Sequence, residues 1–184
     1  MPTRRDCLMG AAGFILVGDA FAQTNLAKGI RSQRGEVLVS SDRITTGPSG
    51  ELTIVVGRDA AMMVRRSSTI MVLANGFRLV TGAVLTVFRP GRSREVVTPT
   101  ATIGIRGTAV YLQAEPRRTY VCTCYGEAEL RSAFDPGSRE TVRTKHHEQP
   151  RYMMAKSSPQ MLTQAPVVNH TDEELRMLEG QLGR

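Results

Sequence analysis

The sequence contains no tryptophan, and aromatic residues make up only 5% of its 184 positions. A folded core must therefore be built from aliphatic side chains, mainly those of Val, Ile, Leu, Met and Ala. Hydrophobic residues account for 41% of the chain, which is enough for a modest core and excludes wholesale disorder. The length is typical of one domain.

The sequence also lacks an apolar run of the roughly 20 residues needed to span a bilayer. The shorter run Cys7–Val17 follows Arg4 and Arg5 and precedes the small-x-small sequence Ala20–Ala22. This three-part order is typical of a secretory signal peptide. We predict a signal peptide over residues 1–22 and an exported, periplasmic mature protein without a transmembrane anchor. The paired arginines leave two routes open, twin-arginine export and the general secretory route.

Charge of one sign is not massed in any segment, although the net charge is +7. The arginines are scattered, which is typical of a solvated surface. A net positive charge of this size is also compatible with binding to a polyanionic partner or to a protein of the cell envelope. We expect no nucleic-acid partner.

Catalytic signatures are missing as well. The chain has no Ser-His-acid pattern, no phosphate-binding loop and no pair of carboxylates in a recognisable motif. Cys122 with His146 or His147 could form a nucleophile and base, but nothing in the flanking sequence indicates a hydrolase. We therefore expect a protein that is not an enzyme.

Turn signals recur every 8–12 residues from Gly35 to Leu130, with short apolar runs between them. Several runs alternate polar and apolar residues, and Asn75-Gly76 between two of them predicts a hairpin. No helical pattern interrupts this region. We predict an all-β domain over residues 35–131, built as a sandwich, barrel or β-solenoid, with a linker over residues 23–34.

The run Thr98–Leu112 contains a change of parity. Ala101, Ile103 and Ile105 share one face of a strand, whereas Val110 and Leu112 after them have the opposite parity. One residue near 105–107 must be absorbed by a bulge or corner, and the glycines at 104 and 107 allow positive φ or close backbone approach. Arg106 between them either faces solvent or ties the corner down by hydrogen bonds.

This segment resembles the signature of the FecR domain, in which a TP-x-A-x-I stretch leads into an RGT motif. The matching residues are Thr98, Pro99, Ala101, Ile103, Arg106, Gly107 and Thr108. The resemblance extends over residues 35–131 and implies a FecR-like β-solenoid or sandwich of short strands in an exported module. The family's anti-sigma role requires a cytoplasmic segment and a membrane helix before the domain, and only the predicted signal peptide precedes it here. The resemblance therefore implies a stand-alone binding or scaffold module.

Two cysteines and all three histidines follow one another late in the chain: Cys122, Cys124, His146, His147 and His170. On a strand, the two cysteines would project from the same face. Thiolates with imidazoles suit a transition metal such as Zn, Cu or Fe, or a haem. Two other readings stay open, a redox-active or strained disulfide between the cysteines and purely structural roles.

Residues 132–184 are expected to form an extended C-terminal arm that ends in a short helix. Thr171 and Glu174 are spaced as a capping box, and Leu175, Leu178 and Leu182 form a narrow apolar stripe. Such a short helix is marginal alone, so we expect it to dock on the β-domain of its own chain.

Two hypotheses for function follow. The first is an exported FecR-like module that binds, scaffolds or signals in the cell envelope. The second is a periplasmic metal- or haem-binding protein that uses Cys122, Cys124 and the histidines at 146, 147 and 170. The two do not exclude each other.

Overall fold

The computed structural model describes residues 25–156 and 158–184. The predicted signal peptide, residues 1–22, lies outside this part of the chain. In the described residues, thirteen strands form one sheet and two helices accompany it. In chain order the elements are α1 Leu26–Gly29, β1 Ile30–Arg34, β2 Val37–Val39, β3 Arg43–Thr46, β4 Glu51–Val56, β5 Ala60–Val64, β6 Thr69–Leu73, β7 Gly76–Phe88, β8 Ser93–Val97, β9 Ala101–Glu115, β10 Arg118–Ser132, β11 Arg139–Thr144, β12 Arg151–Met154, β13 Leu162–Gln164 and α2 Asp172–Gln181.

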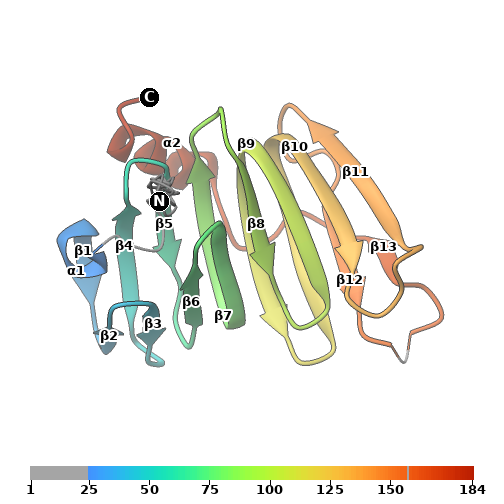
Figure 1. Ribbon diagram of the computed structural model, residues 1–184, viewed down its shortest axis with the longest axis horizontal. Helices are drawn as coiled ribbons and strands as arrows, with labels where there is room; N and C mark the ends of the chain where they lie inside the picture. Colours follow the sequence, from blue (N-terminus) through green and yellow to red (C-terminus); the bar gives the residue numbers. More distant parts are fainter. Residues whose placement is uncertain (1–24, 157) are drawn as a thin grey trace, which may run out of the picture.

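The sheet folds over into two layers because its three longest strands each take part in both (Figure 1). The first half of β7 pairs with β6 and β8, whereas its second half pairs with β5 and β9. Likewise β9 pairs first with β8 and then with β7, and β10 pairs first with β12 and then with β11. We call the layer with β2, β3, β6, β8 and β11 the front layer. The back layer contains β1, β4, β5, β12 and β13.

The main apolar core lies between these layers. Ile70 and Ile103 enter it from the front layer, and Ile54 and Met62 enter it from the back layer, all fully buried. The predicted all-β class with a short C-terminal helix is confirmed, although β7, β9 and β10 are longer than the short strands expected. The predicted hairpin is also present, because Leu73 of β6 pairs with Gly76 of β7.

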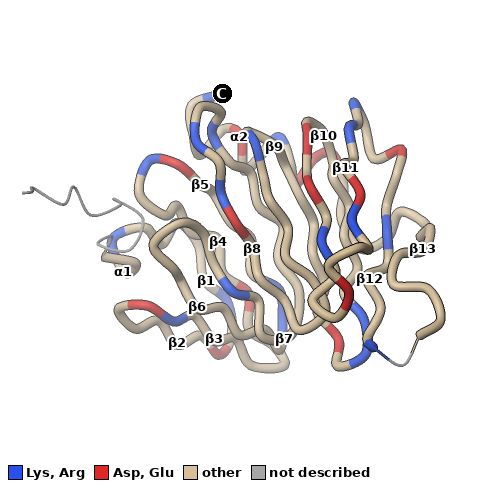
Figure 2. Tube along the Cα trace, turned by 45° about the vertical axis from the view of Figure 1, so that its right-hand side comes forward, with Lys and Arg blue, Asp and Glu red and all other residues tan. Residues whose placement is uncertain are grey.

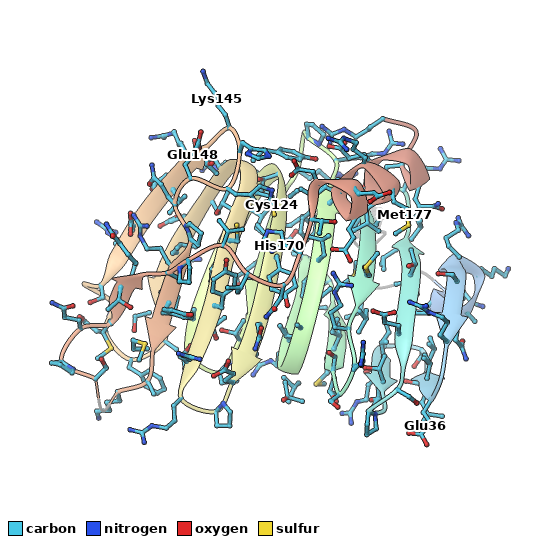
Figure 3. The ribbon with its side chains drawn as sticks, turned by 180° about the vertical axis from the view of Figure 1, so that it is seen from behind. Glu36, Cys124, Lys145, Glu148, His170 and Met177 are labelled. Carbon is cyan, nitrogen blue, oxygen red and sulfur yellow. The ribbon has the colours of Figure 1, made fainter. Side chains whose placement is uncertain are left out.

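A second apolar cluster, the outer cluster, covers the opposite face of the back layer. Helix α2 and the segment before it lie over this face (Figure 3). Its buried members are Val55, Ala61, Met63, Ala83, Leu85, Val87, Ala109, Tyr111, Tyr120, Cys122, Cys124, Leu175, Leu178 and Leu182.

Each long strand passes from one layer to the other near a glycine with positive φ. These are Gly82 in β7 with φ 83°, Gly107 in β9 with φ 62° and Gly126 in β10 with φ 92°. Left-handed backbone of this kind is accessible to glycine at little cost. A Cβ on Gly107 would lie 2.8 Å from the Cα of Pro90, so the backbone also approaches too closely there for a side chain.

The bulge predicted from the change of parity is present. Arg106 pairs with Glu127 and Ala109 pairs with Tyr125, so β9 advances three residues while β10 advances two. Ile105 and Val110 consequently reach the same core despite their opposite parity.

The other residues of the corner have different roles. Gly104 keeps negative or extended backbone, and a Cβ there would make only an ordinary 3.7 Å contact, so the expected need for glycine at this position is wrong. Arg106 is exposed, which favours the solvent alternative, and Thr108 is buried against Gly126.

Two segments differ from the organisation expected. Residues 23–34, predicted as a linker, contain α1 and β1, and β1 pairs with β4 because residues 30–34 extend the edge of the back layer. The arm over residues 132–184 contributes β11, β12 and β13 to the sheet before it ends in α2. Within the described residues, no helix is long and apolar enough to cross a membrane.

Candidate metal centre

The two cysteines belong to β10 and lie in the outer cluster, on the outer face of the back layer. Figure 3 labels Cys124 and His170 on this face. Cys122 and Cys124 are both buried, and both thiols are free. Their spacing places both side chains on one face, as predicted. The pairing of β10 with β9 moves from Thr123 directly to Tyr125, so a bulge removes Cys124 from the regular ladder.

His147 reaches the thiols from the turn that follows β11. Its backbone N–H donates to the carbonyl oxygen of Cys124 at 2.9 Å, and its φ of 52° is left-handed. Its ring Nδ1 lies 3.3 Å from the Sγ atom of Cys122. This turn therefore brings a buried imidazole onto the strand that carries the cysteines.

His170 comes from the opposite direction, at the end of the segment that crosses the outer face. The Tyr120 hydroxyl donates to the carbonyl oxygen of Pro166 at 2.9 Å and so fixes that segment. Asn169 has a left-handed φ of 63°, which turns the chain just before the histidine. The ring of His170 stacks on Tyr111, with centroids 4.7 Å apart and planes 11° from parallel.

These side chains converge on one point. The ligand atoms of Cys122, Cys124, His147 and His170 all lie within 4.8 Å of one another, and we call these four residues the Cys/His cluster. The Nδ1 atom of His147 and the Nε2 atom of His170 are 3.0 Å apart. The convergence that a metal site requires is therefore present.

The outward-facing nitrogen of each ring is held by an oxygen atom that can only accept a hydrogen bond. The Nδ1 atom of His170 lies 2.7 Å from the carbonyl oxygen of Val168. The Nε2 atom of His147 lies 3.1 Å from a carboxylate oxygen of Asp172. Each of these nitrogens must carry the proton, so in the neutral rings both inward nitrogens present lone pairs. Two lone pairs 3.0 Å apart repel unless a proton or a metal cation lies between them.

The pKa values of the two thiols are shifted in opposite directions. A hydrogen bond from the Cys124 thiol, the largest influence, lowers the pKa of Cys122, and burial opposes this. The same hydrogen bond to Cys122, together with burial, raises the pKa of Cys124. Burial and then the charge of Cys122 raise the pKa of Tyr120. The surroundings therefore favour ionisation of Cys122 over that of Cys124, and the thiolate is the form of cysteine that binds metals.

The donor set matches a small soft-to-borderline cation. A tetrahedral zinc ion, with bonds of about 2.3 Å to sulfur and about 2.0–2.1 Å to nitrogen, needs donors roughly 3.3–3.8 Å apart. The Nδ1 atom of His147 lies 3.3 Å from the Sγ atom of Cys122 and 3.0 Å from the Nε2 atom of His170, close to the lower end of this range, and no pair in the cluster exceeds 4.8 Å. A haem fits less well, because its own nitrogens occupy four positions on the iron and leave at most two for protein ligands.

His146, the remaining candidate ligand, is not part of the cluster. Its exposed ring turns away, and its Nε2 atom lies 2.9 Å from a carboxylate oxygen of Asp172, which raises the pKa of His146. It belongs instead to an outer group with His147 and Asp172. The adjacent histidines are thus divided between two environments by the left-handed turn at His147.

Asp172 is the functional candidate that sequence reasoning missed. It bonds to both adjacent histidines from the first turn of α2. A carboxylate that orients a ligating imidazole is a common outer partner of metal sites. Its position two residues after His170 is the only signal in the sequence that could have indicated it.

Comparisons with known proteins find a similarity in structure but none in sequence. No family model matches the chain, and no curated protein sequence matches it. Two crystal structures of a candidate anti-sigma factor from Parabacteroides distasonis ATCC 8503, at 1.65 and 2.50 Å resolution, are similar to it in fold. The TM-scores are 0.57 at 10% sequence identity and 0.56 at 12%, and each alignment covers 73% of this chain.

The chain spans 62% of the length of each of these two structures. At such low identity the similarity concerns the fold alone. Membership of the FecR family stays a prediction, because no family model matches the chain.

Proposed function

We propose that the chain is an exported, non-catalytic module of FecR-like fold that binds a transition metal, with Zn²⁺ as the best candidate, at Cys122, Cys124, His147 and His170. The main support is the pair of inward ring nitrogens, 3.0 Å apart, whose outer nitrogens are already committed to oxygen acceptors. A proton between them would also relieve the repulsion and could pair with the sulfur of Cys122, but it would leave Cys124 without a role. A divalent cation uses all four donors.

The composition of the site favours a structural or regulatory metal over a catalytic one. All four ligands come from the protein, and three of the four side chains are buried. Catalytic zinc sites keep one position open for water or substrate, whereas closed sites with two cysteines and two histidines stabilise folds. In an oxidising compartment, a bound metal would also protect the two thiolates from oxidation.

The role of the whole module rests on its fold. The similarity to a candidate anti-sigma factor and the FecR-like sequence motif both favour regulation or signalling in the cell envelope. Acidic and basic residues are interspersed along the chain rather than gathered on one element (Figure 2). This distribution favours a protein partner over a polyanion.

Metal analysis tests the site directly. The mature chain, from Gln23 onward, should be purified from the periplasm without chelators and analysed for metals by mass spectrometry. We expect about one zinc per chain, and almost none in a Cys122→Ser, Cys124→Ser double variant. His146→Ala is the matched control and should retain its metal, because His146 lies outside the cluster. Wild-type protein that remains metal-free after exposure to Zn²⁺ would disprove the proposal.

Export is tested separately. Intact mass of the periplasmic protein should correspond to a chain that begins at Gln23. Replacing Arg4 and Arg5 by lysines should block export only if the twin-arginine route is used. A full-length chain that begins at Met1 and remains in the cytoplasm would contradict export.

A further inference from the structure

Helix α2 is joined to the Cys/His cluster at its first residues. His170 lies immediately before Thr171, the N-cap of the helix, and Asp172 in the first turn accepts a hydrogen bond from His147. Two of the four cluster side chains are thus connected to the start of α2, while Cys122 and Cys124 belong to the sheet. The cluster therefore joins the helix to β10.

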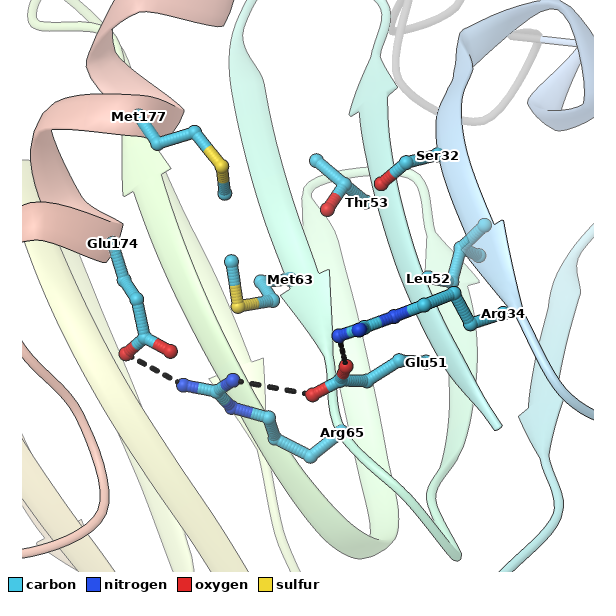
Figure 4. Close-up of a pocket in the computed structure, with 9 residues that line it drawn as sticks. All are labelled: Ser32, Arg34, Glu51, Leu52, Thr53, Met63, Arg65, Glu174 and Met177. Carbon is cyan, nitrogen blue, oxygen red and sulfur yellow. Dashed lines mark hydrogen bonds and ion pairs between the residues drawn. The ribbon is translucent and has the colours of Figure 1, made fainter. Parts of the chain in front are cut away.

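The rest of α2 is held by one apolar stripe and a few polar contacts. Leu175, Leu178 and Leu182 are buried in the outer cluster, as the sequence predicted. Arg65 forms an ion pair with Glu174 at 2.8 Å and a longer one with Glu51 at 3.4 Å, where a cavity of about 240 Å³ separates the helix from β1 and β4 (Figure 4). These contacts seat the helix over β5 and β7.

A helix of this size depends on what it docks against. It has ten residues, and isolated helices shorter than about 12–15 residues are marginal in water. Undocking would expose the apolar side chains beneath it, including those of Met63 and Leu85. It would also withdraw His170 from the two cysteines, because only Thr171 separates this histidine from the helix.

From this geometry we infer that metal binding at the Cys/His cluster controls the docking of α2 on the outer face of the back layer. This inference rests on the proposed metal site and adds its regulation. The metal holds His170 and His147 against β10, so the helix stays seated. Loss of the metal leaves two facing lone pairs at 3.0 Å, and moving His170 outward relieves their repulsion. The helix is then released and the outer cluster is uncovered.

Thermodynamic linkage makes the inference quantitative. If the metal favours the docked helix by some factor, then docking must favour the metal by the same factor. A variant that weakens the packing of α2 on the back layer should therefore bind the metal less tightly, although the substituted residue is not a metal ligand. A purely local metal site would have no such dependence.

Hydrogen exchange measured by mass spectrometry tests the first half of this linkage. Zn²⁺-loaded mature protein should be compared with the same protein after removal of the metal by a chelator. We expect amide exchange in residues 171–182 to accelerate by about tenfold or more without metal, whereas β3 and β6 of the front layer remain protected. If the metal is shown to bind and to be removed, and exchange of α2 does not change, the inference fails while the metal site stands. If no metal binds, the inference fails together with the proposed site.

Zn²⁺ affinity measured by competition tests the reverse direction. Leu178→Ser removes the centre of the apolar stripe and should weaken Zn²⁺ binding by about tenfold. Arg176→Ser is the matched control, because Arg176 is exposed on the same helix and lies outside the outer cluster and the cavity. Its affinity should equal that of the wild type. Should Leu178→Ser fail to fold, Leu182→Ser at the end of the stripe gives a milder test, and unchanged affinity in a folded, helix-released variant would overturn the inference.

Discussion

Single residues decide where this sheet bends. Gly107 combines a left-handed φ of 62° with a backbone that passes Pro90 closely, while Gly104, three residues earlier in the same strand, has neither property. The two glycines look alike in the sequence. Only the first is required by the conformation.

Substitution by valine should separate them. Gly107→Val should lower the free energy of unfolding by about 1–3 kcal/mol, because a β-branched side chain would be strained at positive φ and would collide with Pro90. Gly104→Val should be close to neutral, since its new Cβ would make an ordinary contact with Glu129. Urea denaturation of both variants measures the difference. Equal midpoints would contradict the account of the corner.

Asp172 gives a second prediction at this scale. Asp172→Ala removes the carboxylate that orients the ring of His147, so we expect metal affinity to fall by about 10–100-fold. Glu173→Ala is the matched control, because it removes a negative charge from the same turn of α2 without touching the cluster. Competition with a chromogenic chelator measures both. Similar losses in the two variants would indicate an effect of helix charge rather than orientation of His147.

At the scale of elements, the structural features that could be predicted are those that follow from regular spacings in the sequence. The change of parity around Ile105 indicated the bulge in β9, the spacing of Cys122 and Cys124 placed both thiols on one face, and Thr171 marked the start of α2. Each of these depends on local geometry. Gly126, one of the turn signals between Gly35 and Leu130, does not reverse the chain: it lies within β10 and bends this strand.

Non-local contacts explain what the sequence could not provide. His146 and His147 are chemically identical neighbours, and only the left-handed turn and its hydrogen bond to Cys124 select His147 for the cluster. Arg94 is another example: it is only 2% exposed because Asp59, from a distant turn, pairs with it at 2.6 Å. Nothing in the local pattern distinguishes it from the solvated arginines.

The capping box of α2 provides the prediction for this scale. The Thr171 side chain accepts from the backbone N–H of Glu174, and the Glu174 side chain accepts from the backbone N–H of Thr171. Thr171→Ala should destabilise the helix by about 0.5–2 kcal/mol, whereas Thr171→Ser should preserve it. Amide exchange across residues 172–181 measures the effect. If the alanine and serine variants showed equal protection from amide exchange, the side-chain cap would contribute nothing to the stability of α2.

For the whole molecule, the bound metal should make stability depend on pH in a defined direction. The folded, metal-bound state holds its cysteines as thiolates and its histidines neutral, whereas the unfolded chain binds protons at these groups as the pH falls. The unfolded state then carries more bound protons, so the free energy of unfolding rises with pH. The contribution of the metal to the free energy of unfolding should be largest near about pH 8. It should decrease towards about pH 5.5, which lies below the ordinary pKa of histidine.

The experiment is a pair of thermal unfolding series, with Zn²⁺ and with chelator, across this pH range. The difference in Tm between the two series should shrink as the pH falls, and the Cys122→Ser, Cys124→Ser variant should show no such difference at any pH. Without metal, the lowered pKa of Cys122 contributes stability above the unfolded thiol pKa, and this is lost as pH falls through its folded value. The raised pKa of Cys124 adds almost no slope in this range, because below the ordinary thiol pKa this thiol is protonated in both the folded and the unfolded state. A metal-dependent difference that stays constant, or grows, as the pH falls would exclude thiolates and neutral imidazoles as the ligands.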